Sequence, residues 1–196
     1  MIETSPKQIQ GEWSSGYALD FHTISSEYLG NDEYGNPQYE TNRSDMGEML
    51  YRLKYKSDRS VLRIIVDTAA KFLSNQDWHL DLIIPAPPSR MRKFQPVINV
   101  AKGIAKSLGI KQCTDCVVKI KETPQLKDIY GFHERVELLK NAYAVVEREV
   151  EGRNILLFDD LYRSGATLNS ITQALKNKGR AQEVYTLTLT MTRSIK

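Results

Sequence analysis

The chain has few of the residues that build metal and disulfide sites. Only Cys113 and Cys116 are present, and the three histidines, His22, His79 and His133, are scattered along the sequence. A structural zinc site takes about four Cys or His ligands, and two of them are missing near this pair. We therefore expect both cysteines to be structural or incidental, and a metal or redox centre is disfavoured.

Long apolar runs and a strong charge imbalance are also missing. No segment approaches the ~18 apolar residues of a membrane helix, and the first thirty residues contain no apolar run of signal-peptide length. The 196 residues include 27 Lys and Arg against 24 Asp and Glu, so the net charge of +3 does not indicate a nucleic-acid-binding protein. These features predict a cytoplasmic protein without membrane contact, of a length typical of one domain.

The hydrophobic pattern after residue 80 indicates an α/β fold. Apolar runs alternate with helical patterns there, which is typical of βαβ units and a mainly parallel sheet. The expected strands are Leu80–Ile84, Cys116–Ile120, Tyr143–Val146, Asn154–Phe158 and Glu183–Thr190. The expected helices are Phe94–Leu108, closed by Gly109, Phe132–Lys140, and Ala166–Lys178 with Gly179 as its C-cap.

The first half of the chain has a different pattern. Its first forty residues are polar and aromatic with turn signals at residues 30–37, which predicts a β-hairpin formed by Trp13–Thr23 and Gln38–Thr41. From Ser44, apolar residues recur at spacings of three and four, which predicts two amphipathic helices separated by a turn and cap at Ser57-Asp58. We expect residues 1–45 to form a hood and residues 46–196 to form the main domain.

One segment, Ile155–Leu168, combines the groups that a ribose phosphate requires. An apolar strand is followed by two acids, Asp159 and Asp160, and ligands of open parallel sheets collect beyond such strand ends. Adjacent carboxylates there can accept hydrogen bonds from two sugar hydroxyls. The following turn reads Arg163, Ser164, Gly165, Ala166 and Thr167.

This turn has the features of a phosphate site. It offers successive backbone N–H groups at a helix N-terminus, and Gly165 has no Cβ to obstruct a phosphate. The nucleotide motifs G-x-x-x-x-G-K-[ST] and G-x-G-x-x-G do not occur. The alternative is a core strand followed by a solvated turn that caps a helix. Tyr162, between acids and turn, either packs against ribose or fills space.

The segment resembles the signature for 5-phosphoribosyl-1-pyrophosphate (PRPP) of the type I phosphoribosyltransferase family. In that signature an apolar strand, two acids and a T-G-x-T-like loop follow in the same order. The resemblance covers most of the chain after about Met46 and is closest to the ComF-like group, which is similar to amidophosphoribosyltransferases. Three stretches carry it: Ile83–Pro87 before a basic cluster, Thr123–Leu126 followed by Arg135, and Asp159–Thr167. The four-cysteine zinc module usual at the N-terminus of that group is absent here.

The resemblance implies a fold and roles for named residues. The fold is a mainly parallel central sheet flanked by helices, with an N-terminal hood. The pyrophosphate loop corresponds to Pro85, Ala86, Pro87, Pro88, Ser89 and Arg90. Residues with catalytic roles are Asp159, Asp160, Arg90, Arg92, Lys121 and Arg135, with Lys93 and Lys119 as further contacts. Mg²⁺ is expected to bind through PRPP, together with Asp159 and Asp160.

Two functional hypotheses follow. The first is an Mg²⁺-dependent phosphoribosyltransferase that transfers the phosphoribosyl group to a base or amine and releases pyrophosphate. The second is a non-catalytic PRPP- or nucleotide-binding regulatory protein related to competence and single-stranded DNA. Arg52, Lys54 and Lys56 beside Tyr51 and Tyr55 would suit nucleic acid, although ordinary amphipathic helices more often have this pattern. The resemblance also implies a homodimer, because members of the family commonly dimerise.

Overall fold

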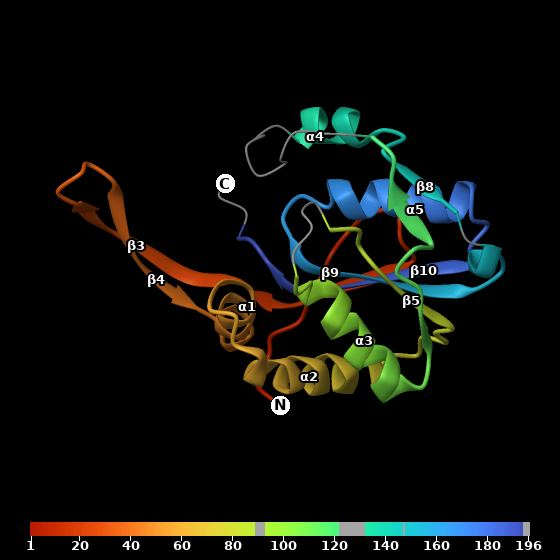
Figure 1. Cartoon of the computed structure of the whole chain (residues 1–196), viewed down its shortest axis with the longest axis horizontal. Coiled ribbons are helices and arrows are strands. Elements are labelled where there is room, and N and C mark those ends of the chain that lie inside the picture. Colours follow the sequence, from red (N-terminus) through yellow and green to blue (C-terminus); the bar gives the residue numbers. More distant parts are fainter. Residues whose placement is uncertain (89–92, 122–131, 147, 194–196) are drawn as a thin grey trace.

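The computed structural model describes residues 1–88, 93–121, 132–146 and 148–193. Its centre is a six-stranded sheet in the order β1-β2-β10-β9-β5-β6 (Figure 1). The strands are β1 (Lys7–Gln8), β2 (Ser15–Phe21), β5 (Leu82–Pro85), β6 (Lys111–Gln112), β9 (Asn154–Tyr162) and β10 (Glu183–Met191). All pairings from β2 to β6 are parallel, and β1 is antiparallel to β2. The expected mainly parallel sheet is confirmed.

Helices cover both faces of this sheet (Figure 1). α1 (Asp45–Tyr55), α2 (Leu62–Ser74) and α3 (Pro96–Leu108) pack on one face, and α5 (Ala166–Asn177) packs on the other, next to α4 (Phe132–Leu139). Leu156 and Phe158 of β9 belong to the core on the α1 face, whereas Ile155 and Leu157 belong to the core on the α5 face. This alternation of a fully buried strand fixes where the residues after Phe158 point.

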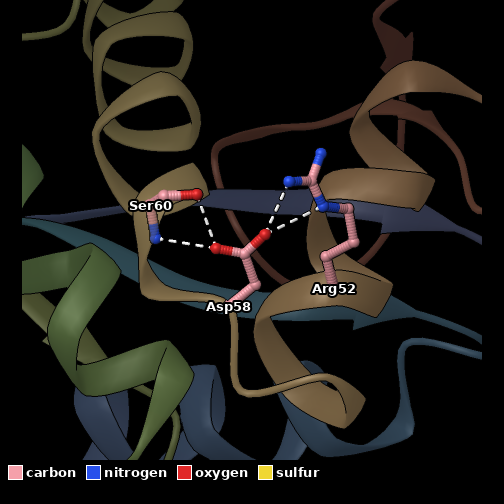
Figure 2. A network of polar contacts seen from close by, with 3 residues as sticks. All are labelled: Arg52, Asp58 and Ser60. Carbon is pink, nitrogen blue, oxygen red and sulfur yellow. Dashed lines mark hydrogen bonds and ion pairs between the residues drawn. The ribbon is translucent and has the colours of Figure 1, made fainter.

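The turn between α1 and α2 lies where the sequence predicts it. A short 3₁₀ helix, η1 (Arg59–Val61), precedes α2 and has Asp58 as its N-cap. One carboxylate oxygen of Asp58 accepts from the backbone N–H and hydroxyl of Ser60, and the other accepts from the guanidinium of Arg52 (Figure 2). Asp58 therefore ties the last turn of α1 to the start of the next helical segment.

Most predicted elements after residue 80 are present with small shifts. Gly109 caps α3 in the left-handed conformation, with φ of 69°, as expected. The C-cap of α5 is Lys178 rather than Gly179, and β9 runs past Phe158 to Tyr162. The acids of the motif are thus the continuation of the strand and not a turn after it.

The N-terminal hairpin prediction is wrong about its first strand. Trp13–Thr23 contributes β2 to the central sheet, because its buried Ala18 and Leu19 lie in the two cores. The hairpin is formed by β3 (Thr23–Asn31) and β4 (Pro37–Arg43), which project from the body (Figure 1). The expected hood is thus divided between the sheet and this hairpin.

Two other predicted strands leave the central sheet. β7 (Val117–Lys119) and β8 (Tyr143–Val145) form a separate antiparallel pair, here called the flap. The position beside β5 is occupied by β6, so β7 has no partner there. Cys113 and Cys116 form a buried disulfide in the turn between β6 and β7, which fits the structural interpretation of the pair. Among the described residues, no helix is long and apolar enough to span a membrane.

Candidate functional site

The two acids of the motif lie at the carboxyl end of β9, inside the sheet. The neighbouring strands β5 and β10 run parallel to β9, so their carboxyl ends meet at the same edge. Pro85 pairs with Phe158, and the N–H of Ala86 donates to the Phe158 carbonyl at 2.8 Å. The stretch expected to bind pyrophosphate therefore begins directly beside the acid pair.

The two carboxylates lie on opposite faces of the sheet. Strand alternation continues from Phe158, which places Asp159 on the α5 face and Asp160 on the α1 face. The backbone N–H of Asp160 donates to Oδ1 of Asp159 at 2.8 Å. The two carboxylates therefore lie on opposite sides of the end of β9, and not next to each other on one side as the sequence suggests.

Asp159 has a strongly altered acidity. Burial is the largest cause and the Asp160 carboxylate the second, and together they raise the pKa of Asp159 to about 7. The N–H of Asp160 and the ammonium of Lys54 act in the opposite direction but do not prevail. Asp159 is thus partly protonated near neutral pH, and a cationic ligand would favour its carboxylate form.

Tyr143 of the flap joins the α5 side of the site. Its ring is buried, and its hydroxyl hydrogen-bonds with the side chain of Thr167 at the start of α5. Burial, followed by the charge of Asp159, raises the pKa of Tyr143 to about 12. The phenol therefore keeps its proton, and the flap is linked to the predicted phosphate turn.

Lys54 of α1 is the direct partner of Asp160. Its Nζ lies 2.9 Å from Oδ2 of Asp160, and the two side chains are only 20% and 15% exposed. Burial alone would lower the pKa of Lys54, but the Asp160 carboxylate outweighs it and the pKa is raised. Lys54 therefore stays charged. Its ammonium neutralises part of the charge of the acid pair, and the ion pair holds α1 to the sheet.

His22, directly after β2, completes the α1 side. The Thr190 hydroxyl donates to the Asp160 carbonyl at 3.2 Å and lies 3.3 Å from Nδ1 of His22. Because a hydroxyl has one hydrogen, Nδ1 is the donor in the second contact and Nε2 is left as an acceptor. Burial, then the charges of Arg43 and Lys54, lower the pKa of His22 despite Asp160, so the ring is neutral.

The predicted phosphate turn lies at the N-terminus of α5. Gly165 is its N-cap, with φ of 75°, and has no side chain to accept from the N–H groups of the first turn. A Cβ at this position would lie 2.9 Å from Cε2 of Tyr162. Glycine is therefore required by the backbone and by Tyr162, in addition to any phosphate. Arg163 is exposed, and Ser164 and Thr167 are half-buried.

The structure describes the side chains of only some of the expected cations. Lys93 and Lys121 are exposed, and Lys119 is half-buried. Ser89, Arg90, Arg92 and Thr123–Leu126 lie outside the described residues, as does the side chain of Arg135 in α4. Their expected contacts with pyrophosphate remain predictions.

Three residues of the site have no signal in the sequence. Lys54, Tyr143 and His22 are remote from the motif along the chain and reach it only through the packing of α1, the flap and β2. The described residues contain no cluster of three or more His, Cys, Asp or Glu that would hold a metal alone. Two carboxylates are oxygen ligands suited to Mg²⁺, which is commonly shared between protein and phosphate groups. Asp160 is already paired with Lys54, so Asp159 is the carboxylate of the pair without a cation beside it at ion-pair distance among the described residues.

Comparisons of sequence identify related proteins with a competence role in their names. The chain is 28% identical over 148 residues to competence protein ComFC of Bacillus subtilis, covering 74% of this chain and 59% of that protein. It is 26% identical over 142 residues to competence protein F of Haemophilus influenzae, covering 67% and 62%. The match thus spans about three fifths of each relative. No family model matches the chain.

Comparison of structures supports the fold. Glutamine PRPP amidotransferase from Bacillus subtilis, complexed with ADP and GMP, superposes with a TM-score of 0.50 and 18% identity. The match covers 88% of this chain and 37% of that one. Together with the sheet order and the flanking helices, it shows that this chain has the type I phosphoribosyltransferase fold and is similar to the ComF-like group.

Proposed function

We propose that this chain, a relative of ComF-like competence proteins with the type I phosphoribosyltransferase fold, binds PRPP at Asp159–Thr167 and transfers its phosphoribosyl group to a base or amine. The observation that carries the proposal is the placement of Asp159 and Asp160. They lie among the last four residues of β9, and α5 begins soon after them at Ala166 without a side-chain cap, so acceptors for sugar hydroxyls lie near donors for a phosphate.

Three parts of the site each bind a different part of PRPP. Asp159 and Asp160 accept hydrogen bonds from the ribose hydroxyls, one from each side of the strand end. The backbone N–H groups of residues 164–167 receive the 5-phosphate, with Thr167 held in place by Tyr143. The stretch that begins at Pro85 receives the pyrophosphate, because it starts next to β9.

The transfer step breaks the bond between C1 of ribose and the pyrophosphate oxygen, and the acceptor nitrogen forms the new bond to C1. The bonding electron pair leaves with pyrophosphate, so the protein must stabilise negative charge on the leaving group. Arg90, Arg92, Lys121 and Arg135 are proposed for this role. Bound Mg²⁺ would add positive charge at the phosphate oxygens, with Asp159 and Asp160 as its protein contacts.

A second candidate is a PRPP- or nucleotide-binding regulatory protein without turnover. Both relatives are named competence proteins, which supports a role in competence for this candidate. The basic helix offers less support for a nucleic-acid site, because Arg52 is paired with Asp58 and Lys54 with Asp160.

Calorimetric titration with PRPP and Mg²⁺, followed by an assay of pyrophosphate release with a panel of bases and amines, tests both candidates. Binding with acceptor-dependent release is the result expected for the transferase. Binding without release with any acceptor would support the regulatory protein instead. No detectable binding would reject the proposed site.

The double variant Asp159→Asn with Asp160→Asn tests the assignment of residues. We expect it to lose PRPP binding and to retain its circular dichroism spectrum, because each substitution preserves the size of the side chain, while loss of the ion pair with Lys54 lowers stability without changing the fold. Asp81→Asn is the matched control. Asp81 accepts from the N–H of Asn154 at the opposite end of β9, so its substitution should leave PRPP affinity unchanged. Unchanged affinity in the double variant would refute the site.

A further inference from the structure

His22 follows β2 at the same edge of the sheet as the two acids. β2 is parallel to β10 and β10 is parallel to β9, so the carboxyl ends of all three strands meet there. The N–H of His22 donates to the carbonyl of Met191 at 2.8 Å. On the other side of β10, the N–H of Thr192 donates to the carbonyl of Tyr162 at 2.9 Å. These bonds hold the three strand ends side by side, with β10 between His22 and the acids.

The start of α1 holds the backbone at His22. The hydroxyl of Ser44, the N-cap of α1, donates to the carbonyl of Phe21. Gly47 in the first turn of α1 lies so close that a Cβ there would be 2.1 Å from the carbonyl oxygen of His22. The ring of His22 therefore extends from a fixed backbone, as a group that acts on a substrate requires.

The ring of His22 has one nitrogen engaged and one open. Nδ1 lies 3.3 Å from the hydroxyl of Thr190, whose hydrogen is donated to the carbonyl of Asp160. Nδ1 therefore carries the ring hydrogen, and Nε2 has a free lone pair. No group in the described part of the chain hydrogen-bonds with Nε2, and this nitrogen is not among the buried polar atoms without a partner. Nε2 is thus accessible to a ligand.

Charged groups from three elements surround the ring. After burial, Arg43 of β4 and Lys54 of α1 lower the pKa of His22, and Asp160 of β9 opposes them without prevailing. The ring is therefore neutral before the reaction, which is the form that can accept a proton. Once a proton has been accepted, the carboxylate of Asp160 stabilises the imidazolium.

His22 also lies on the side of β9 from which an acceptor would approach. The stretch proposed for pyrophosphate begins at Pro85 of β5 on one side of β9, whereas β10 and β2 lie on the other side. In a single displacement at C1, the nucleophile approaches from the face opposite to the leaving group. The acceptor then enters over β10. Neighbouring strands are ~4.8 Å apart, so a planar acceptor over β10 can reach both C1 above β9 and the ring of His22.

We propose that His22 is a catalytic residue that takes the proton of the acceptor N–H group on Nε2, and that the acceptor is a planar nitrogen heterocycle. The electron pair of the acceptor nitrogen forms the bond to C1, and the pair of the C1–oxygen bond leaves with pyrophosphate. The proton moves to Nε2, and the ring then carries hydrogens on both nitrogens until solvent removes one. Thr190 is a positioning residue, because its oxygen accepts from Nδ1.

The chemistry of the proton transfer favours a heterocycle over an aliphatic amine. An aliphatic amine has a pKa of about 10 and is an ammonium ion near neutral pH, without a lone pair for attack. A neutral imidazole is too weak a base to remove that proton in advance. A heterocyclic nitrogen keeps its lone pair, and its N–H becomes acidic as the bond to C1 forms, so a weak base is sufficient. This inference rests on the proposed transfer reaction and adds its acceptor side.

Steady-state kinetics with PRPP and Mg²⁺ test the proposal, with adenine, hypoxanthine and uracil as heterocycles and ethylamine as the amine. The wild type should release pyrophosphate with at least one heterocycle and not with ethylamine. His22→Ala should lower kcat at least about a hundredfold and leave PRPP affinity unchanged. Added imidazole should restore part of the rate, which a purely structural role of His22 would not allow. His79→Ala is the matched control, since His79 is exposed and precedes β5 at the opposite edge of the sheet.

Two further variants separate proton transfer from folding. His22→Asn retains an N–H donor for Thr190 but cannot take a proton, so it should be as slow as His22→Ala. Thr190→Val preserves size and removes the partner of Nδ1, so it should lower kcat by a smaller factor, without rescue by imidazole.

The outcomes distinguish this inference from the proposed function. A wild type that releases pyrophosphate while His22→Asn is equally fast, or a slow His22→Ala that imidazole does not restore, would overturn the role of His22 and leave the transfer reaction in place. Release with ethylamine alone would overturn the class of acceptor. A wild type that does not bind PRPP, or binds it and releases no pyrophosphate with any acceptor, would overturn the transfer reaction and this inference together.

Discussion

Gly165 is constrained by its backbone conformation and by the ring of Tyr162 at the same time. We expect Gly165→Ala to lower the free energy of unfolding by more than the ~1–2 kcal/mol that a left-handed conformation costs a residue with a Cβ. The variant should also lose PRPP affinity, because the first turn of α5 would shift. Denaturant unfolding and calorimetry measure the two effects.

Gly152→Ala separates these two constraints. Gly152 has φ of 68°, close to that of Gly165, but a Cβ there would have no heavy atom within 4 Å. Its substitution should therefore show the conformational cost alone and leave PRPP binding intact. If both variants were destabilised equally, the contact with Tyr162 would have no energetic role.

Asp159 provides a prediction about pH. Its pKa is raised from 3.8 to about 7, so the native state binds more protons than the unfolded state between these values. The stability of the wild type therefore falls as the pH rises from about 4 to about 7 and levels off above this range. Asp159→Asn does not titrate, so its stability relative to the wild type should increase over the same interval. Thermal unfolding in a pH series measures this difference.

Asp160→Asn is the companion variant for this measurement. Asp159 still titrates in it, but without the neighbouring carboxylate that helps to raise its pKa, so the pH-dependent interval should become narrower. A difference between Asp159→Asn and wild type that is the same at every pH would contradict the raised pKa.

At the scale of elements, the contact between α1 and β9 rests on Lys54 and Asp160. Lys54→Met keeps the length of the side chain and leaves Asp160 without its cation, which should lower the free energy of unfolding by about 2 kcal/mol. It should also raise the pKa of Asp159 further, because Lys54 lowers it in the wild type. Unfolding experiments in a double-mutant cycle with Asp160→Asn measure the coupling.

Arg63→Met is the control for this cycle. Arg63 pairs with Asp67 on the surface of α2, where its side chain is 90% exposed, so no measurable change is expected. Equal effects of the two substitutions would show that burial of the Lys54 pair is unimportant.

The candidate site could be predicted from the sequence where its residues are contiguous. The acids, Gly165 and the helix start follow one another, and the apolar strand before them fixes the sheet edge at which they lie. Lys54, Tyr143 and His22 could not be predicted, because their place depends on how three distant elements pack. The opposite directions of the two carboxylates also depend on β9 continuing through them, whereas the apolar pattern ends at Phe158.

At the scale of the whole molecule, local patterns predicted elements better than their partners. α2, α3 and β10 follow from their periodicity, and the sheet is mainly parallel as expected. The errors concern pairing: β2 joins β10 instead of forming the hairpin, and β7 and β8 pair with each other instead of joining the parallel sheet. A short apolar pattern predicts that a strand forms. Which strand it pairs with depends on competition for positions at the edge of the sheet.

The division between the sheet and the hairpin of β3 and β4 leads to a prediction about the whole chain. The two ends of the hairpin are close together, since the hydroxyl of Ser44 donates to the carbonyl of Phe21. None of residues 23–43 is buried, so replacing residues 24–42 by two glycines should leave the sheet, both cores and the site in place. We expect cooperative thermal unfolding and PRPP affinity close to those of the wild type. Differential scanning calorimetry and calorimetric titration on the same sample measure these outcomes. Loss of PRPP binding in a folded variant would mean that the hairpin contributes to the site.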